Sequence, residues 1–269
     1  STYPYNPYLV PWTNSLFENG PACAMGIRAR WDQLGWREKK LLDIGGGGAR
    51  WDSGFQWLGR VPVRGMDINV LVLDTQVYSN TGGQASTASF AGQDAKMAAV
   101  GRESYGKRER RKELAQICLM HPDIYVAQTT PAHINHFYKA IMEANEYSGP
   151  AVINVYTTCQ PEHGVPDCNS ARQAKLAVET RAFPLFIHDP GKGDRIRERL
   201  SLVGNPSQKA DWWTPPNSDK PVTFIDFART EGRFAKQFDK DGKPSLTLLQ
   251  AEEERLRNWR MLQELAGLC

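Results

Sequence analysis

Ile68–Leu73 reads INVLVL and is the strongest strand candidate in the chain. The run is apolar on both faces, which is typical of a strand in the middle of a covered parallel sheet. Leu41–Ile44, Ile124–Ala127 and Ala151–Tyr156 have a similar character. Between the last two runs, apolar residues recur at helical spacing from His133 to Tyr147. Because strand, helix and strand come in this order, the sequence predicts a right-handed parallel crossover.

The remaining pattern divides the chain into two parts. Residues 1–190 predict an α/β domain with a mostly parallel sheet covered by helices. Residues 191–245 are polar and rich in proline, glycine and tryptophan, with little periodicity. A helix is expected from Ser245 toward Gly267, with one apolar stripe that consists of Leu249, Leu256, Trp259 and Ala266. Residues 191–269 are therefore expected to form an irregular and helical C-terminal extension that packs on the domain or on a partner.

Composition excludes several classes of protein. The 269 residues carry a net charge of +3, too small to indicate a nucleic-acid partner. No apolar run approaches the ~18 residues that a membrane span needs, and the first residues, STYPYNPYLVPW, lack the pattern of a signal peptide. The five cysteines form no CxxC pair and no zinc-binding spacing; they are Cys23, Cys118, Cys159, Cys168 and Cys269. We expect a cytoplasmic protein with reduced thiols and with neither a nucleic-acid nor a membrane partner.

Four glycines follow the first strand candidate, within Leu41–Gly54 (LLDIGGGGARWDSG). Backbone N–H groups in such a loop form an anion site, because no side chain blocks a phosphate and because glycine tolerates a positive φ. Gly45, Gly46, Gly47 and Gly48 fit this role, and a plain flexible turn is the alternative. The run is not a Walker loop, because no Gly-Lys-Ser/Thr follows, and Arg50 breaks a GxGxxG pattern.

The same glycines also allow an S-adenosylmethionine methyltransferase, in which an acid at the end of the second strand holds a ribose. Asp67 is the candidate acid. It stands before Ile68–Leu73, however, so it begins a strand and no helix follows it directly. The methyltransferase is therefore the weaker hypothesis.

Leu73–Gln84 (LDTQVYSNTGGQ) follows the strongest strand at its carboxyl end, where α/β sheets bind ligands. The turn is crowded with oxygen-bearing side chains, namely Asp74, Thr75, Tyr78, Ser79, Asn80 and Thr81. Such a turn suits a hard cation shared with substrate phosphates, and an Asx-type turn with satisfied side chains is the alternative. Together with the glycines upstream, the turn favours a diphosphate–Mg²⁺ site.

The segment LDTQVYSNTGGQ resembles the thiamine-diphosphate turn of the pyruvate:ferredoxin (flavodoxin) oxidoreductases, which are 2-oxoacid:acceptor oxidoreductases. Further similar stretches keep the family's order; they are WTNSLF (12–17), WDSGF (51–55), AKMAAVG (95–101), YVAQT (125–129) and VYTTCQPEHG (155–164). The resemblance covers most of residues 10–190 and implies the thiamine-diphosphate-binding fold.

The resemblance also implies roles for individual residues. The metal ligands of the turn fall on the Thr75 side chain and the Val77 carbonyl, and Asn80 matches an asparagine beside the reactive ring of the cofactor. Cys159 matches the last of four cysteines that bind a [4Fe–4S] cluster, and the other three precede Ser1 in the family's order. The chain therefore resembles the C-terminal domain of a longer polypeptide, or one subunit. A buried thiol is the alternative for Cys159.

One residue departs from the family pattern. The family has a metal-binding aspartate where this chain has Gly47, so the metal loses one ligand and one negative charge. Water can fill the position, because Mg²⁺ often keeps waters, and the expected loss is about 1–3 kcal/mol, or roughly 5- to 150-fold in affinity. Asp52 has a counterpart in the family and is expected to be structural. A catalytically degenerate scaffold of the same fold is the alternative function.

For an intact member, the resemblance implies oxidative decarboxylation of a 2-oxoacid such as pyruvate to acyl-CoA and CO₂, with thiamine diphosphate, Mg²⁺, a [4Fe–4S] cluster and coenzyme A. The implied partners are the remaining domains or subunits, ferredoxin or flavodoxin, and further copies in a homo-oligomer. The run Arg102–Lys112 is expected to be a solvated face, with steering of an acidic partner as the alternative. Cap or loop roles are expected for His133, His136 and His163.

Overall fold

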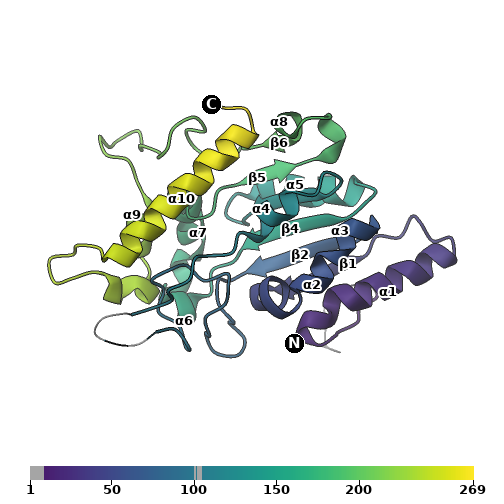
Figure 1. Cartoon of the computed structure of the whole chain (residues 1–269), viewed down its shortest axis with the longest axis horizontal. Coiled ribbons are helices and arrows are strands. Elements are labelled where there is room, and N and C mark those ends of the chain that lie inside the picture. The colour runs from purple at the N-terminus through teal and green to yellow at the C-terminus, as the bar shows by residue number, and fades with distance from the viewer. Residues whose placement is uncertain (1–8, 100, 102–104) are drawn as a thin grey trace.

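A six-stranded sheet forms the centre of the computed structural model, which describes residues 9–99, 101 and 105–269 (Figure 1). The strand order is β1-β2-β4-β3-β5-β6. The first four strands of this order are mutually parallel, whereas β5 and β6 each pair antiparallel. The bounds are β1 Leu42–Gly46, β2 Asn69–Asp74, β3 Tyr125–Thr129, β4 Ala151–Tyr156, β5 Phe186–His188 and β6 Leu200–Ser201.

Helices cover this sheet and extend it at both ends. Their bounds are α1 Gly20–Gln33, α2 Phe55–Leu58, α3 Arg60–Arg64, α4 Leu114–Leu119, α5 Ile134–Glu146, α6 Gln160–His163, α7 Ser170–Glu179, α8 Ile196–Arg199, α9 Phe224–Arg229 and α10 Leu246–Leu265. Helix α1 lies beside the edge strand β1, and α10 runs across the molecule on the side of β5 and β6 (Figure 1). The predicted α/β class with a mostly parallel sheet is confirmed.

The predicted strands agree with the observed ones to within two residues. All residues of β3 and β4 are buried, because these strands lie inside the sheet and α5 covers one of its faces. The β3–α5–β4 unit is the predicted parallel crossover. Strand β1 runs two residues further than Leu41–Ile44, so the first two glycines are extended strand.

The predicted stripe of α10 is confirmed only in part, because Trp259 is fully buried whereas Leu249 is exposed. Leu249 is 41% exposed, and the apolar residues that the helix buries are Leu248, Ala251, Trp259 and Leu262. The helix begins after Ser245 as predicted, and the Ser245 hydroxyl accepts from the Leu248 N–H.

The C-terminal residues share their packing with the sheet. Trp259 and Leu262 belong to the same apolar cluster as Val70 and Val72 of β2. A second cluster joins the phenylalanines of residues 224–234 to Phe90 and Tyr156. The proposed division at residue 190 therefore separates two stretches that bury one another.

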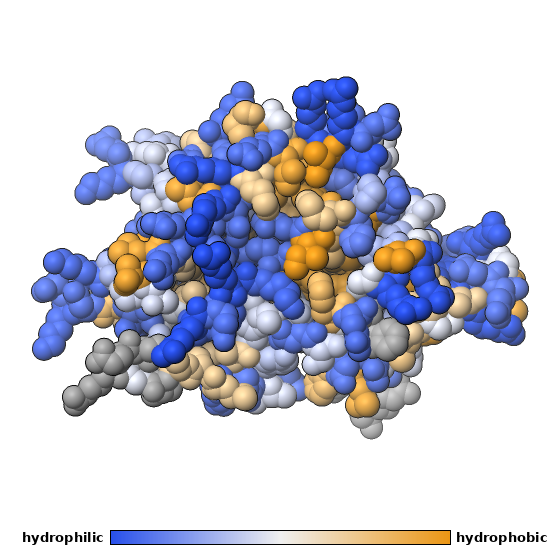
Figure 2. Space-filling model, viewed as in Figure 1, coloured by the Kyte–Doolittle hydropathy of each residue, from blue (hydrophilic) through white to orange (hydrophobic). Residues whose placement is uncertain are grey.

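The surface offers few broad apolar areas in the view of Figure 2, where apolar residues form separate patches among polar ones. Among the described residues, no helix combines the length and hydropathy that crossing a bilayer requires. Residues 1–8 of the N-terminal stretch and residues 102–104 of the basic run lie outside the described residues.

Candidate functional site

Three chain segments meet at the carboxyl edge of the parallel strands. Gly46 at the end of β1 pairs with Leu73 of β2, and Asp74 at the end of β2 pairs with Tyr156 of β4. The glycines, the turn at 75–81 and the segment toward Cys159 therefore leave the sheet side by side. This edge is where parallel α/β sheets bind ligands.

The four glycines differ in the space around them, and none of them has a positive φ. A Cβ on Gly45 would lie 2.4 Å from the Arg50 guanidinium carbon, and one on Gly48 would lie 2.2 Å from the Tyr78 ring. Close packing therefore explains these two glycines. A Cβ on Gly46 meets nothing within 4 Å, and one on Gly47 makes only ordinary contacts. The open part of the predicted phosphate loop is thus Gly46 and Gly47.

Two oxygens of the turn converge. The Thr75 Oγ1 atom donates to the Val77 carbonyl oxygen at 3.1 Å. When Mg²⁺ binds oxygens octahedrally at about 2.0–2.1 Å, adjacent ligands lie about 2.9 Å apart. The separation of these two hydrogen-bonded oxygens is thus close to that of two adjacent ligands of one magnesium ion.

The other residues of the turn are placed in different ways. The Ser79 hydroxyl is buried and has no partner among the described residues. Asn80 is exposed, and Thr81 closes the turn by donating to the Gln84 side-chain oxygen at 2.6 Å. Gly82 and Gly83 have φ values of 103° and 86°, which explains this Gly-Gly pair.

Tyr78 connects the turn to the segment after the glycines. Its hydroxyl donates to Asp52 at 2.6 Å, and burial, followed by the effect of this carboxylate, raises the pKa of Tyr78. Asp52 also accepts from the backbone N–H and the hydroxyl of Thr87. The interactions of Asp52 are those of a structural residue.

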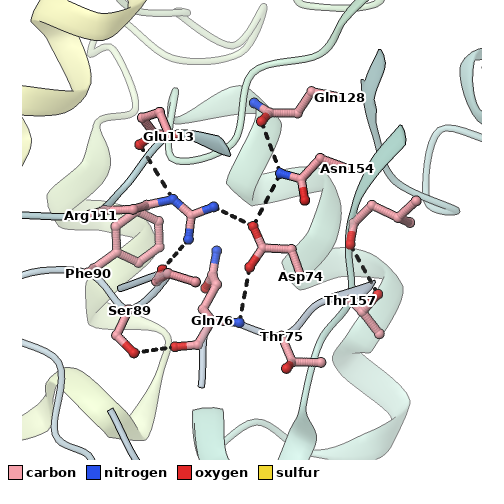
Figure 3. Close-up of polar contacts among 12 residues, drawn as sticks. Asp74, Thr75, Gln76, Ser89, Phe90, Arg111, Glu113, Gln128, Asn154 and Thr157 are labelled. Atoms are coloured by element: carbon pink, nitrogen blue, oxygen red, sulfur yellow. Dashed lines mark hydrogen bonds and ion pairs between the residues drawn. The ribbon is translucent and has the colours of Figure 1, made fainter. Parts of the chain in front are cut away.

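Asp74 lies beneath the turn and is fully buried (Figure 3). Its carboxylate pairs with Arg111 and accepts from Asn154 at 3.4 Å and from the Gln76 backbone N–H at 3.2 Å. Asp74 therefore contributes to the site by supporting the turn from within, and both of its oxygens are engaged by the protein.

The basic run is only in part the solvated face that its sequence favours, because Arg108 and Arg110 are exposed whereas Lys107 and Arg111 are buried. Arg111 is 4% exposed and pairs with Asp74 and Glu113, and its guanidinium lies 4.5 Å from the Trp51 ring centroid. Lys107 is 5% exposed and donates to the Ser89 carbonyl at 2.7 Å, and burial lowers its pKa to about 8. Both side chains therefore bind partners inside the protein.

His163 is likewise part of the interior. Its Nε2 atom lies 2.8 Å from the Thr75 carbonyl oxygen, which fixes the backbone of the turn from below. Burial, with a further effect of Arg233, lowers the pKa of His163 well below its ordinary value, so the ring is neutral. The expected cap or loop role does not describe His163. His133 does precede α5 at the N-cap position, without a side-chain cap.

Cys159 is partly exposed and immediately precedes α6. Within the described ranges, no group of three or more His, Cys, Asp or Glu residues could hold a metal ion. A cluster at Cys159 would therefore need ligands from elsewhere.

A cavity of about 410 Å³ adjoins the glycines from the outer side of β1, between α1 and the segment 11–17. Gly45, Gly46 and the buried ion pair of Asp43 with Arg50 line it. The ion pair closes at 2.7 Å. Sequence reasoning singled out neither this pair nor the contacts of Gln76, Arg111 and Arg233. The partners of these last three residues lie far away in the chain, whereas Asp43 and Arg50 are only seven positions apart.

The chain matches the family described as thiamine pyrophosphate enzyme, C-terminal TPP binding domain, over residues 1–155. The pyruvate-flavodoxin oxidoreductase of Rhodospirillum rubrum is 36% identical over 235 residues, which cover 86% of this chain and 18% of that protein. Subunit PorB of the pyruvate synthase of Methanosarcina barkeri is 30% identical over 241 residues, which cover 89% of this chain and 75% of that subunit. The chain thus spans less than a fifth of the Rhodospirillum protein.

Among solved structures, a 2-oxoglutarate:ferredoxin oxidoreductase from Magnetococcus marinus, with 2-oxoglutarate, coenzyme A and succinyl-CoA bound, aligns with a TM-score of 0.46 and 21% identity. The alignment covers 53% of this chain and 46% of that one. The methyltransferase hypothesis has no support in these matches. Its candidate acid, Asp67, precedes β2 and pairs with Lys40 at 2.9 Å.

Proposed function

Because the chain belongs to the thiamine pyrophosphate enzyme family through its cofactor-binding domain, we propose that it is the thiamine-diphosphate-binding part of a pyruvate-type 2-oxoacid:ferredoxin or flavodoxin oxidoreductase. The observation that carries the proposal is the convergence of the Thr75 hydroxyl and the Val77 carbonyl, beside two unobstructed glycines. These are the groups that a magnesium-bound diphosphate requires.

In this proposal Thr75 and Val77 supply two oxygen ligands to Mg²⁺, and Gly46 and Gly47 let the diphosphate approach the backbone. The unpartnered Ser79 hydroxyl is a further group that can bond to the cofactor, and the exposed Asn80 lies at the rim of the turn. Bound thiamine diphosphate supplies a carbon nucleophile and an electron sink for the decarboxylation of a 2-oxoacid. The chain itself binds the cofactor and orients it.

The complete reaction needs more than this chain. We propose that Cys159 contributes one ligand to a [4Fe–4S] cluster whose other cysteines lie in further domains or subunits. Coenzyme A as acyl acceptor, ferredoxin or flavodoxin as electron acceptor, a homo-oligomeric assembly and a cytoplasmic location complete the proposal. Mutation of Cys159 to Ser in the assembled enzyme should lower the iron content, and an unchanged content would exclude this ligand.

Gly47 offers a direct test of the metal site. A Cβ at this position would lie 3.7 Å from the Leu73 carbonyl oxygen and 3.7 Å from Trp51 Nε1, so the Cβ of an aspartate makes only ordinary contacts there. The Trp51 Nε1 donor is buried without a partner among the described residues and can steady the new carboxylate. We expect Gly47→Asp to tighten the binding of Mg²⁺–thiamine diphosphate roughly 5- to 150-fold in isothermal titration calorimetry.

Gly26→Asp is the matched control, because it places the same charge at an exposed glycine of α1, where a Cβ also meets nothing within 4 Å. If the original chain binds the cofactor and Gly47→Asp binds no more tightly than Gly26→Asp, the assignment of the metal position is wrong.

A second candidate function is a degenerate scaffold of the same fold, which the glycine at position 47 favours. The two functions separate in the same titration. Measurable binding by the original chain supports the enzyme component, whereas binding only after Gly47→Asp supports a scaffold that has lost its cofactor.

A further inference from the structure

Gln76 lies in the chain between Thr75 and Val77, the two residues of the proposed metal site, and its backbone conformation is unusual. Its φ is 61°, in the left-handed region that non-glycine residues rarely occupy. This conformation lies between Thr75 and Val77, whose oxygens meet at 3.1 Å. A strained residue of this kind persists only where the surrounding structure holds it.

The backbone of Gln76 is held on both sides (Figure 3). Its N–H donates to Asp74 Oδ1 at 3.2 Å. Its carbonyl oxygen accepts from the Ser89 hydroxyl at 2.5 Å and from Gln93 Nε2 at 3.3 Å. The chain therefore cannot leave the left-handed region at this position without losing several buried hydrogen bonds.

The Gln76 side chain is anchored by a residue of the C-terminal extension. Its Oε1 atom accepts from Arg233 Nη2 at 2.6 Å, although the two residues are 157 positions apart. Arg233 Nη1 donates to Gln93 Oε1 at 3.0 Å, so Gln76, Gln93 and Arg233 close a ring of hydrogen bonds. All three side chains are at most 4% exposed.

Arg233 is itself fixed. Its Nε atom donates to Glu231 at 2.6 Å, and its guanidinium lies 5.1 Å from the Phe234 ring centroid. The planar fork of arginine bonds to two acceptors in a set geometry, which a lysine cannot reproduce. The anchor is thus rigid and points directly at the turn.

We infer that Gln76 is the positioning residue of the metal turn, and that Arg233 in the segment Gly232–Gln237 holds it in the left-handed conformation that brings the Thr75 and Val77 oxygens together. This inference deepens the proposed function, since it gives the C-terminal extension a part in cofactor binding. It requires the turn to be rigid before any metal arrives, because preorganised ligands bind more tightly.

The first test uses the full chain without cofactor and measures amide hydrogen exchange. In Gln76→Ala, the exchange of the Tyr78 amide, which donates to Gln84, should accelerate about ten- to hundredfold, the factor for losing one hydrogen bond to a charged donor. Amides of β4 should keep their protection, whereas a merely structural role would accelerate them equally. Arg233→Lys should have the same local effect.

Gln76→Gly separates the anchor from the backbone strain, because glycine adopts a positive φ freely but offers no acceptor to Arg233. We expect the Tyr78 amide of Gln76→Gly to exchange as fast as that of Gln76→Ala. Exchange of this amide at the original rate would overturn the inference. Ser207→Ala is the control for an exposed left-handed residue outside the site, with a φ of 47°. It should leave the turn unchanged.

The second test titrates Mn²⁺ in the presence of thiamine diphosphate and follows the EPR signal of free Mn²⁺. Gln76→Ala should raise the apparent Kd for the metal about tenfold, and Ser207→Ala should not. If the original chain binds no metal, the proposed function fails, while the exchange experiment still decides whether Gln76 and Arg233 hold the turn. Unchanged exchange at Tyr78 in Gln76→Ala would overturn the inference whatever the metal does.

Discussion

Arg111→Met should destabilise the protein by about 3 kcal/mol. Arg111 is buried between the carboxylates of Asp74 and Glu113, and it also donates to the Ala88 carbonyl. Breaking a buried ion pair by removing one partner costs about 3–5 kcal/mol, because the other charge remains buried and unpaired. Here the cost falls at the lower end. Asp74 keeps its bonds from Asn154 and the Gln76 N–H, and Glu113 keeps its pair with Arg255.

Urea unfolding followed by circular dichroism measures this loss, with Arg110→Met as the matched control. Arg110 is the exposed neighbour, so the control should change the free energy of unfolding by less than about 0.5 kcal/mol. Adding Asp74→Asn to Arg111→Met removes the unpaired charge and should restore about 1 kcal/mol or more. A loss below about 1 kcal/mol in Arg111→Met, or a double variant with a lower free energy of unfolding than Arg111→Met alone, would refute the account of this network.

Two further predictions concern Gly48, beside the turn, and the buried Lys107. Gly48→Ala should lower the free energy of unfolding by about 1–3 kcal/mol, because its Cβ would lie 2.2 Å from the Tyr78 ring. Gly46→Ala is the control: its Cβ meets nothing within 4 Å, so it should cost less than about 1 kcal/mol. Equal melting temperatures of the two variants would contradict this difference. Burial lowers the pKa of Lys107 from 10.5 to about 8, so the unfolded chain binds more protons between these values and stability should rise with pH across that window. Lys107→Met should abolish its share of this rise in urea titrations, and an identical pH profile for both proteins would show that Lys107 titrates normally.

Much of the architecture follows from local sequence. Asn69–Asp74 and Ala151–Tyr156 were identifiable because strands buried on both faces need continuous apolar runs. The turn after Asp74 was identifiable because oxygen-bearing residues directly follow such a strand. Parallel pairing then places the glycines next to that turn, since the carboxyl ends of parallel strands share one edge.

Other features depend on contacts that no local pattern records. The basic run predicted a solvated face, but Arg111 turns inward because Asp74, 37 residues earlier, offers a buried carboxylate. Leu249 of α10 was expected to be buried but is 41% exposed, because the helix packs against the apolar clusters through Leu248, Trp259 and Leu262. The four glycines look equivalent in the sequence, but in the structure Gly45 packs against Arg50 and Gly48 against Tyr78, and the other two are open.

The sequence by itself therefore determined the class of fold, the positions of the main strands along the chain and the position of the turn. It could do so because burial on one or both faces leaves a regular pattern of apolar residues in the chain. Only the tertiary structure decided that Gln76 adopts a left-handed conformation and that Arg233 holds it there. The physical reason is that a buried polar side chain is defined by its partner, and here the partner is brought close by folding alone.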